Sequence, residues 1–522
     1  MFLIVIGVLS ILLAFPAPPY RLVQAPGMLM ASVAVATLLP PVIALVSARR
    51  GVYLLERLPA RPDRGQHALA LGASVTHGAL ALLHGALLVA TDWMNLCREV
   101  PVLGAWPVAP SLLAATPFLA CVTLIWIANY PADRAIRQIA LESQLLRGEP
   151  VRPVWTLGRY LAFNLRHQIL FILIPMLLIL LARDVIDRYQ DQLGAIAERM
   201  QRRGGVKAAG RNTYNFLPDL LLGSAALLVA VVAPGILRHV WVTRPLPDGP
   251  LRDRLVWLCR KLRMRCREIL VWHSGGMIIN AAVMGVIAPL RYVMITDAML
   301  ERMDDTKIEA VFGHEAGHVK RWHIWHFLLF AFVSGCIITI LSAHVRGMTR
   351  DEYQLATGIV GAILIAKWWF IFGWISRRFE RQADLFGVRT LAISGLPCEE
   401  VCALHGAAGA APGEPNGGAG VARARRGDPL CRTAARVFAQ TLMDVARMNG
   451  ITPDARSWRH GSIQSRSRTV ERLAGDPLAT LRFERSVARI QYGILIAALG
   501  FGLWAAWEVK LWALFGLRWF QG

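Results

Sequence analysis

The chain has 522 residues, of which 55% are hydrophobic, and its mean hydropathy is +0.44. This length excludes one small domain, and this composition places much of the chain in lipid. The formal charge is +22, from 57 Lys and Arg against 35 Asp and Glu. The arginines cluster in loops between apolar runs, without a nucleic-acid-binding motif. We therefore expect no nucleic-acid partner, and instead expect basic loops that contact anionic lipid headgroups.

Six apolar runs in residues 1–238 predict an N-terminal membrane domain of about six helices. Most of these runs approach the roughly 20 residues that cross a bilayer. The first run has no basic residue ahead of it, as a secretory signal would have, so we interpret it as an uncleaved anchor. The runs cover 1–15, 28–47, 68–91, 111–129, 169–182 and 220–237.

The loops between these runs predict the orientation of the chain. Loops 48–67 and 130–167 carry five and six arginines, whereas 16–27 and 92–110 carry one each. The positive-inside rule places the two arginine-rich loops in the cytoplasm, and six crossings then return the chain to that side. Residues 183–216 disagree, because they should lie outside and yet carry seven Lys and Arg among acidic residues. They predict an amphipathic helix on the membrane surface.

Residues 239–326 predict a compact α+β unit on the cytoplasmic side. Residues 254–270 read as a basic helix, and 277–287 and 291–296 read as β-like runs. We expect the second run to be an edge strand beside the helix that follows. An edge strand can pair with an extended peptide backbone of almost any sequence. The alternative is an ordinary core hairpin, and both interpretations can hold.

A His-Glu-x-x-His box lies in that following helix, at His314, Glu315 and His318. Positions i and i+4 share one helix face, so both imidazoles can reach one metal ion, and zinc accepts imidazole nitrogen readily. Glu315 stands beside the first ligand, where it can take a proton from a water at the metal. The alternative is two surface histidines and a glutamate on an ordinary helix.

A zinc site of this kind needs a third protein ligand. A histidine six residues after His318 would supply it in one subtype, but position 324 is Ile324. Glu380 and Asp384 are the better candidates, because they lie one helical turn apart. Glu380 can bind zinc, and Asp384 can accept a hydrogen bond from a ligating histidine. The alternative is a charged helix whose i,i+4 pairs face water.

These residues resemble a known family, the integral-membrane zinc metallopeptidases that include HtpX and the type I CAAX prenyl protease. The resemblance covers about residues 270–475. Its matching positions are His314, Glu315, His318, Arg378, Glu380, Ala383 and Asp384, with Asn280, Ala281 and Gly285 upstream of 292–296. It implies a mainly α, polytopic membrane protein with a zincin-like α+β catalytic unit embedded between transmembrane helices. It also implies one Zn²⁺ per chain.

A later segment extends the resemblance less closely. Residues 458–463, followed by Arg466, are similar to the family's His-Pro segment followed by an Arg, although Gly461 stands where the family has Pro. The resemblance implies that His460 and Arg466 support the tetrahedral oxyanion or bind the substrate backbone. The alternative is a basic helix face that also includes Arg468 and Arg472 and touches lipid headgroups.

The rest of the chain completes the predicted organisation. Residues 327–375 predict a membrane hairpin, interrupted by Lys367, that returns Glu380 to the side of His314. Residues 376–488 would form the second part of the catalytic unit, with a Gly-, Ala- and Arg-rich flexible insertion at 405–430. Residues 489–522 predict a C-terminal membrane helix with an aromatic tail.

Four residues around the insertion allow a second, structural zinc site, with free thiols in a reducing compartment as the alternative. They are Cys398, Cys402, His405 and Cys431.

Taken with the resemblance, the sequence predicts a zinc endopeptidase of a bacterial inner membrane, with its active site facing the cytoplasm and membrane or membrane-associated proteins as substrates. One alternative is a prenyl-protein processing protease. Another is a transporter or scaffold with an inert metal site, in which His77, His84 and Lys367 would be central.

Overall fold

The structure is a computed structural model that describes residues 23, 25–57, 62–146, 154–203, 217–276, 278–345, 363, 367–400, 404 and 429–508. These residues are mainly helical and include one four-stranded sheet. The chain divides into two compact units, Met1–Ala197 with Asn215–Ala230, and Glu198–Tyr214 with Val231–Gly522. The predicted anchor at 1–15 lies outside the described residues.

The first unit is built from long apolar helices, in which α2 packs against α3 and α5. Phe118, Trp126 and Leu180 are among the buried side chains of its core. Other apolar side chains, such as Val42 and Val46 of α2, are exposed, as lipid-facing residues are. Its elements are α2 (Pro26–Arg57), α3 (Pro62–Ala90), α4 (Trp93–Glu99), η1 (Leu103–Ala105), α5 (Ala109–Leu146), α6 (Leu157–Asn164), η2 (Leu165–Leu170) and α7 (Phe171–Arg188).

Six described helices are long and apolar enough to cross a membrane, which makes the chain a polytopic membrane protein. The spans are Pro26–Arg57, His67–Leu88, Ala109–Ile139, Leu157–Arg188, Leu220–Val240 and Pro477–Trp504. Each overlaps an apolar run of the sequence. The charged stretch after α7 forms α8 (Gln190–Arg203), and α9 covers Leu217–Val240. Most of the second half of the predicted hairpin lies outside the described residues.

The sheet of the second unit has the strand order β1-β2-β4-β3. Its strands are β1 (Thr243–Pro245), β2 (Glu268–Trp272), β3 (Ala281–Met284) and β4 (Tyr292–Thr296). β2 and β4 are parallel, with Ile269 opposite Val293 and Val271 opposite Ile295, whereas β1 and β3 pair antiparallel at the two edges.

Two predictions about this region are wrong. The run 291–296 forms the interior strand β4, and β3 is the edge strand instead. All five residues of β4 are buried, because its apolar run has a strand on each side. The basic helix predicted over 254–270 is α10 (Pro250–Lys261), which ends nine residues earlier than predicted. Arg263 takes a left-handed backbone conformation, with φ 49°, and the chain then enters β2 to pair with β4.

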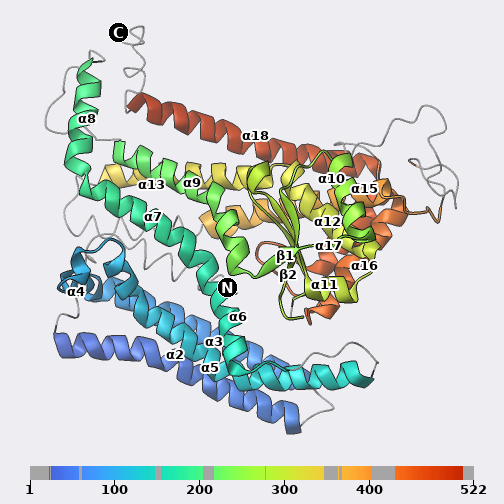
Figure 1. Cartoon of the computed structure of the whole chain (residues 1–522), viewed down its shortest axis with the longest axis horizontal. Coiled ribbons are helices and arrows are strands. Elements are labelled where there is room, and N and C mark those ends of the chain that lie inside the picture. The colour runs from blue at the N-terminus through green and yellow to red at the C-terminus, as the bar shows by residue number, and fades with distance from the viewer. Residues whose placement is uncertain are drawn as a thin grey trace. The chain divides into compact units, whose positions relative to one another are not determined.

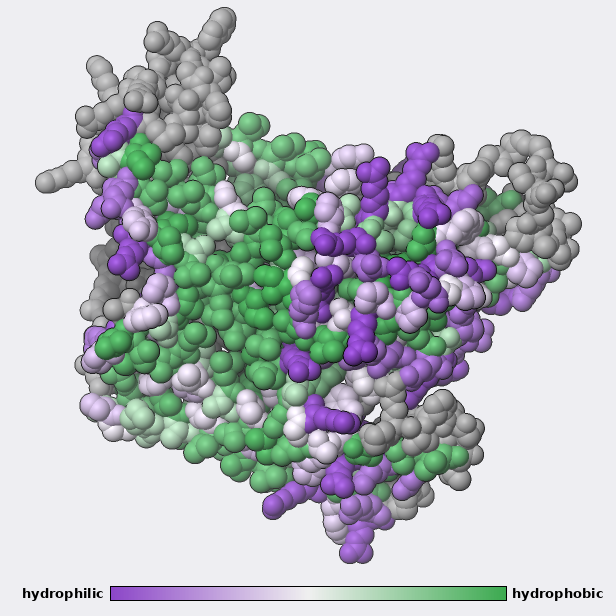
Figure 2. Space-filling model, viewed as in Figure 1, coloured by the Kyte–Doolittle hydropathy of each residue, from purple (hydrophilic) through white to green (hydrophobic). Residues whose placement is uncertain are grey.

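Helices cover the sheet of the second unit (Figure 1). Ile308, Phe312 and Ala316 of α12 enter the same buried core as Val293 and Ile295 of β4. The helices are α10, α11 (Asp297–Arg302), α12 (Asp305–Lys320), α13 (His323–Val345), α15 (Gly373–Ile393), α16 (Arg432–Met448), α17 (Ile463–Gly475) and α18 (Pro477–Glu508), with short η3 (Ala288–Leu290) and η4 (Trp368–Phe372). Figure 2 shows hydrophobic residues over the long apolar helices and hydrophilic residues over the part that Figure 1 labels α10, α15 and α16.

Candidate metal centre

Helix α12 holds the His-Glu-x-x-His box in a fixed orientation. Its start is capped by Asp304, whose carboxylate accepts a hydrogen bond from the Lys307 N–H at 2.9 Å. One face of α12 is buried against the sheet. His314 and His318 lie one turn apart on another face of the same helix.

Two glycines let α15 approach that face closely. A Cβ on Gly313 would lie 2.7 Å from the Cβ of Thr390, and one on Gly317 would lie 3.0 Å from the Cα of Ala383. The first distance is too short for a real side chain and the second is tight, so α12 and α15 pack at this separation because position 313 is glycine. The close packing brings Glu380 of α15 to the two histidines.

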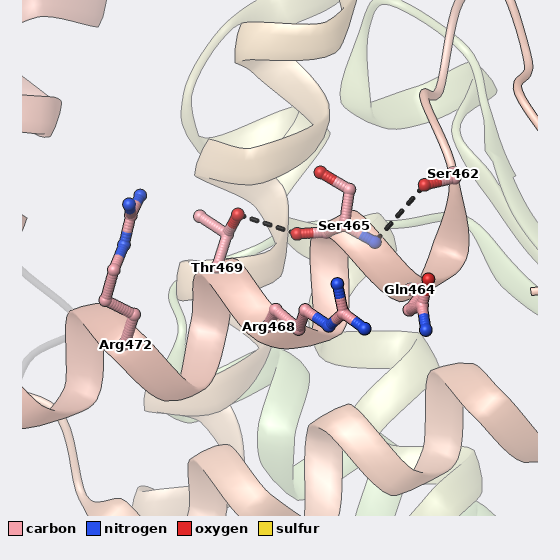
Figure 3. A pocket seen from close by; sticks show the side chains of 6 residues that line it. All are labelled: Ser462, Gln464, Ser465, Arg468, Thr469 and Arg472. Carbon is pink, nitrogen blue, oxygen red and sulfur yellow. Dashed lines mark hydrogen bonds between the residues drawn. The ribbon is translucent and has the colours of Figure 1, made fainter. Parts of the chain in front are cut away.

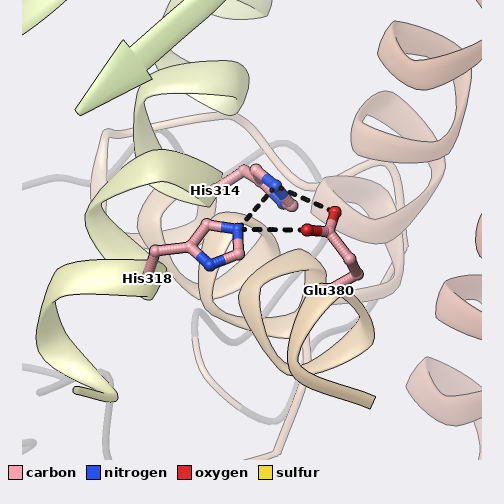
Figure 4. A group of neighbouring side chains, drawn as sticks. All are labelled: His314, His318 and Glu380. Carbon is pink, nitrogen blue, oxygen red and sulfur yellow. Dashed lines mark hydrogen bonds and ion pairs between the residues drawn. The ribbon is translucent and has the colours of Figure 1, made fainter. Parts of the chain in front are cut away.

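The three candidate ligands converge on one point, as Figure 4 shows. Their ligand atoms all lie within 4.8 Å of one another. The Nε2 atoms of His314 and His318 are 3.2 Å apart, and the Glu380 carboxylate oxygens lie 3.7 and 3.6 Å from them. Around a tetrahedral zinc ion with the usual bond lengths, neighbouring ligand atoms are about 3.3–3.6 Å apart. The donor set and its spacing therefore fit zinc.

Asp384 orients the first histidine. Its Oδ1 lies 2.9 Å from Nδ1 of His314, so Nδ1–H donates to the carboxylate and Nε2 keeps its lone pair for a metal. Arg466 donates to both oxygens of Asp384, at 2.9 and 2.6 Å, and lies 3.4 Å from Glu380. Burial alone would raise the pKa of Asp384, but the Arg466 charge and the His314 hydrogen bond hold it below its usual value.

A second chain of hydrogen bonds orients His318. The Oε1 of Gln382 lies 2.9 Å from Nε2 of His323, whose Nδ1 lies 3.0 Å from Nδ1 of His318. Since the amide oxygen can only accept, Nε2–H of His323 donates to it, and Nδ1–H of His318 donates to His323. This leaves Nε2 of His318 with its lone pair directed at Glu380. Burial lowers the pKa of His318 to about 4, so its ring is neutral near pH 7.

The ring of His323 is fully buried and stacks on Phe379, with 4.4 Å between the ring centroids. Sequence reasoning missed Gln382. No local pattern indicates this role, because Gln382 is two residues from both Glu380 and Asp384 and so does not share their helix face.

Glu315 lies between the metal ligands and the sheet edge. Its Oε2 accepts a hydrogen bond from the Val283 N–H of β3 at 3.3 Å. Burial raises the pKa of Glu315, and the Glu380 charge adds to this effect although His314 opposes it. A raised pKa suits a group that must take and return a proton.

His460 reaches the site on a tight turn. Ser457 and Gly461 exchange two backbone hydrogen bonds, of 3.1 and 2.9 Å, and Gly461 has φ 75°. Proline could neither take this φ nor donate the N–H, so this turn excludes proline and favours glycine. Nδ1 of His460 lies 3.0 Å from Oε1 of Glu380. Burial would raise the pKa of Glu380, but the hydrogen bond from His460 and the Arg466 charge keep it well below its usual value.

The two faces of α17 differ in chemistry. Arg466 is buried and turned toward Asp384, whereas Arg468 and Arg472 are exposed. Figure 3 shows the exposed pair with Ser462, Ser465 and their neighbours. Together they line a pocket of about 280 Å³. The basic-face alternative therefore fits Arg468 and Arg472, but the structure does not place Arg466 on that face.

The remaining candidates lie elsewhere. The sulfur atoms of Cys398 and Cys431 are 3.5 Å apart and buried, while Cys402 and His405 fall outside the described residues. The second metal site stays a prediction. Within the described part of the chain, the group with metal-ligand spacing is His314, His318 and Glu380.

The polar residues of the transporter alternative have local partners. His84 lies with Nδ1 3.1 Å from the carbonyl of Leu80 in its own helix. Lys367 donates to Ser334 at 2.9 Å. These contacts are those of packed membrane helices.

The chain combines six described helices that are long and apolar enough to cross a membrane with a His-Glu-x-x-His helix and a glutamate on a second helix, a combination typical of integral-membrane metallopeptidases. Comparison with known proteins agrees with this class. Residues 261–474 match the model of peptidase family M48.

Two curated relatives are similar to this chain. One is a CAAX prenyl protease 1 homolog of Arabidopsis thaliana, 25% identical over 28% of this chain and 38% of its own length. Another is a CAAX prenyl protease 1 homolog of Dictyostelium discoideum, 25% identical over 32% of this chain and 44% of its own length. The chain thus spans less than half of either relative. A crystal structure of Ste24p from S. mikatae is 13% identical, with a TM-score of 0.42 and coverage of 86% of this chain and 99% of that one.

Proposed function

We propose that this protein is a zinc-dependent endopeptidase that hydrolyses peptide bonds of membrane or membrane-associated proteins. The observation that carries the proposal is the convergence of His314, His318 and Glu380, whose ligand atoms have the mutual spacing of a tetrahedral zinc site. Each of the two histidines has its other nitrogen fixed by a hydrogen bond, which selects the tautomer that binds metal.

The catalytic roles follow from where the side chains lie. Bound zinc would lower the pKa of a water molecule and polarise the scissile carbonyl. Glu315 takes the proton of the attacking water and passes it to the leaving amine, because it lies next to His314 and is anchored to the edge strand through Val283. An extended peptide would pair with the free side of β3, which presents its backbone beside Glu315.

His460 and Arg466 would serve the transition state in different ways. The Arg466 guanidinium is engaged with Asp384 and Glu380, so we assign it the role of holding both carboxylates in place. His460 is about half exposed, with 47% of its side chain accessible and only Nδ1 directed at Glu380. Its Nε2–H would donate to the oxyanion that develops at the scissile carbonyl.

The test combines metal content with hydrolysis. Purified protein in detergent should hold one zinc per chain and cleave unstructured peptides, and a chelator should abolish cleavage until zinc is added back. Glu315→Gln should keep its zinc and lose at least roughly 100-fold in kcat, the scale of general acid–base catalysis. Full activity in zinc-loaded Glu315→Gln would remove Glu315 from the mechanism.

A second candidate function is processing of prenylated proteins at their C-termini. It is favoured by the names of the two curated relatives, both CAAX prenyl protease 1 homologs. Matched peptides with and without a prenyl group on a cysteine separate the candidates. A large preference for the prenylated peptide would identify a prenyl-protein protease, and equal turnover would identify a general membrane endopeptidase.

We also propose a bacterial inner-membrane location with the metal centre facing the cytoplasm. The arginines of 48–67 and 130–167 support this orientation, since positive loops stay inside. A cysteine placed in loop 48–67, in a background without the native thiols, should resist an impermeant thiol reagent in intact cells and react after lysis. Labelling in intact cells would reverse the orientation.

A further inference from the structure

A cavity of about 430 Å³ lies in the second unit beside the metal centre. His318, a candidate zinc ligand, forms part of its wall. Gly285 and Val286, which directly follow the edge strand β3, form another part. A peptide that pairs with β3 next to Glu315 therefore has this cavity at one end of its path.

Four cationic side chains line the cavity, and no acidic side chain does. They are Arg263, Arg265, Arg291 and Lys320. Among the residues that the structure describes, none of the four forms an ion pair with a carboxylate. Arg291 instead donates to the carbonyl oxygens of Gly285, Val286 and Arg265, and Lys320 donates to the carbonyl of Arg263. Carbonyls satisfy the N–H groups but leave the positive charges uncompensated.

Two helix ends shape the cavity wall. Arg263 follows the C-cap of α10 and Trp322 follows that of α12, with φ 49° and 61°, and a left-handed residue at this position is a common way to end a helix. Trp322 is 58% exposed. A large aromatic side chain on the rim of a cationic cavity suits binding of a peptide.

We propose that this cavity binds a carboxylate of the peptide substrate, either an acidic side chain or the free C-terminus, and so selects substrates with a negative charge near the cleaved bond. Guanidinium and ammonium groups pair with carboxylates through strong, charge-assisted hydrogen bonds. The wall shared with His318 favours a peptide over a lipid headgroup, because a ligand here lies against the catalytic centre. This inference rests on the proposed peptidase function.

The experiment measures kcat/KM of zinc-loaded protein in neutral detergent for matched fluorogenic peptides. One series replaces each Gln of a neutral peptide by Glu in turn, and a second compares a free with an amidated C-terminus. At least one acidic position, or the free C-terminus, should raise kcat/KM by roughly 10-fold or more, the scale of a charged hydrogen bond. The responding series identifies the source of the carboxylate.

Two variants assign the preference to the cavity. Arg265→Gln combined with Lys320→Gln should reduce the ratio of kcat/KM for acidic and neutral peptides to near one, mainly through KM. Arg260→Gln is the matched control, since Arg260 is an exposed arginine near the end of α10 that does not line the cavity. It should keep the wild-type ratio.

The possible outcomes are distinct. Hydrolysis without any preference for a carboxylate would overturn this inference alone, and so would an unchanged ratio in the double variant. Hydrolysis is also measured after addition of vesicles containing phosphatidylglycerol. If the double variant kept the wild-type preference for acidic peptides but lost a stimulation by these vesicles that the wild type shows, the cavity would be a lipid headgroup site and the inference would be wrong. No hydrolysis of any peptide by the zinc-loaded protein would overturn the proposed function and this inference together.

Discussion

Gln382 offers a sharp test of how the metal centre is held together. Gln382→Leu keeps the approximate volume of the side chain but removes the oxygen that accepts from His323, 2.9 Å away. Nε2–H of the fully buried His323 would then lack an acceptor, and the proton would favour Nδ1. That nitrogen faces Nδ1 of His318 at 3.0 Å, so two N–H groups would oppose each other unless His318 moved its proton to the metal-binding nitrogen.

The magnitude follows from this geometry. An unsatisfied buried donor costs about 1–3 kcal/mol, and loss of a hydrogen bond to a metal-ligating histidine weakens metal binding by roughly 10–100-fold. We expect Gln382→Leu to weaken zinc binding within that range and to leave kcat of the zinc-saturated protein close to wild type. Competition with a chromophoric chelator measures the zinc Kd.

Two controls separate this effect from general destabilisation. Gln382→Glu restores an acceptor and should recover zinc affinity. Gln491→Leu makes the same substitution at another buried glutamine, on α18, whose amide donates to the carbonyl of Arg321. It should lower the unfolding temperature without changing zinc affinity. Wild-type zinc affinity in folded Gln382→Leu would refute the proposed hydrogen-bond chain.

Three further predictions concern the same site. Glu380→Ala should lose both zinc and activity, and stoichiometric zinc in that variant, measured by elemental analysis, would require another third ligand. His460→Ala should lower kcat by roughly 100-fold with little change in KM or zinc content, because an oxyanion contact exists mainly in the transition state. The control Arg468→Gln, on the outer face of α17, should leave kcat unchanged. Equal kcat in the two variants would argue against a catalytic role of His460. Burial would lower the pKa of His314, but its partner Asp384 raises this pKa above its usual value. Burial lowers the pKa of His318 to about 4. Zinc competes with protons for both rings, so the zinc affinity should fall as the pH drops through the raised pKa of His314 and again near pH 4. Chelator competition at a series of pH values measures this affinity. A zinc affinity that does not change with pH would contradict this protonation pattern.

Sequence patterns predict the membrane helices well because the signal is local. A run of about 20 apolar residues is sufficient to cross a bilayer, and each of the six spans overlaps such a run. The His-Glu-x-x-His box is local in the same sense, since helical geometry alone puts His314 and His318 on one face.

Strand order is not local, and there the sequence misleads. Residues 291–296 and 277–287 both look β-like, and alternation within a run does not reveal how many strands flank it. Burial of every residue in β4 is consistent with an interior strand, but that burial depends on β2, whose first three residues were predicted to be part of the helix 254–270. Assigning 268–270 to that helix removed most of the partner strand that makes β4 interior.

The hydrogen bonds around the ligands are still less visible in sequence. Gln382 and His323 are 59 residues apart, and Arg466 and Asp384 are 82 apart. Their meeting depends on close packing of α12 and α15 at Gly313 and on a turn whose Gly461 departs from the family pattern. Resemblance pointed to Arg466, but no pattern pointed to Gln382.

The charges at the centre support one divalent cation. Glu315, Glu380 and Asp384 are three buried or largely buried carboxylates, and Arg466 is the guanidinium among them. Three carboxylates against one guanidinium leave two negative charges when Glu315 is ionised, and one when both ring nitrogens of His460 carry a proton, as donation to Glu380 and to the oxyanion requires. Both ligating histidines are neutral when they bind metal. One Zn²⁺ offsets this excess. A buried excess of negative charge is costly, and it also explains why the Glu380 charge adds to burial in raising the pKa of Glu315. The same residues that hold the metal thus prepare Glu315 to exchange a proton.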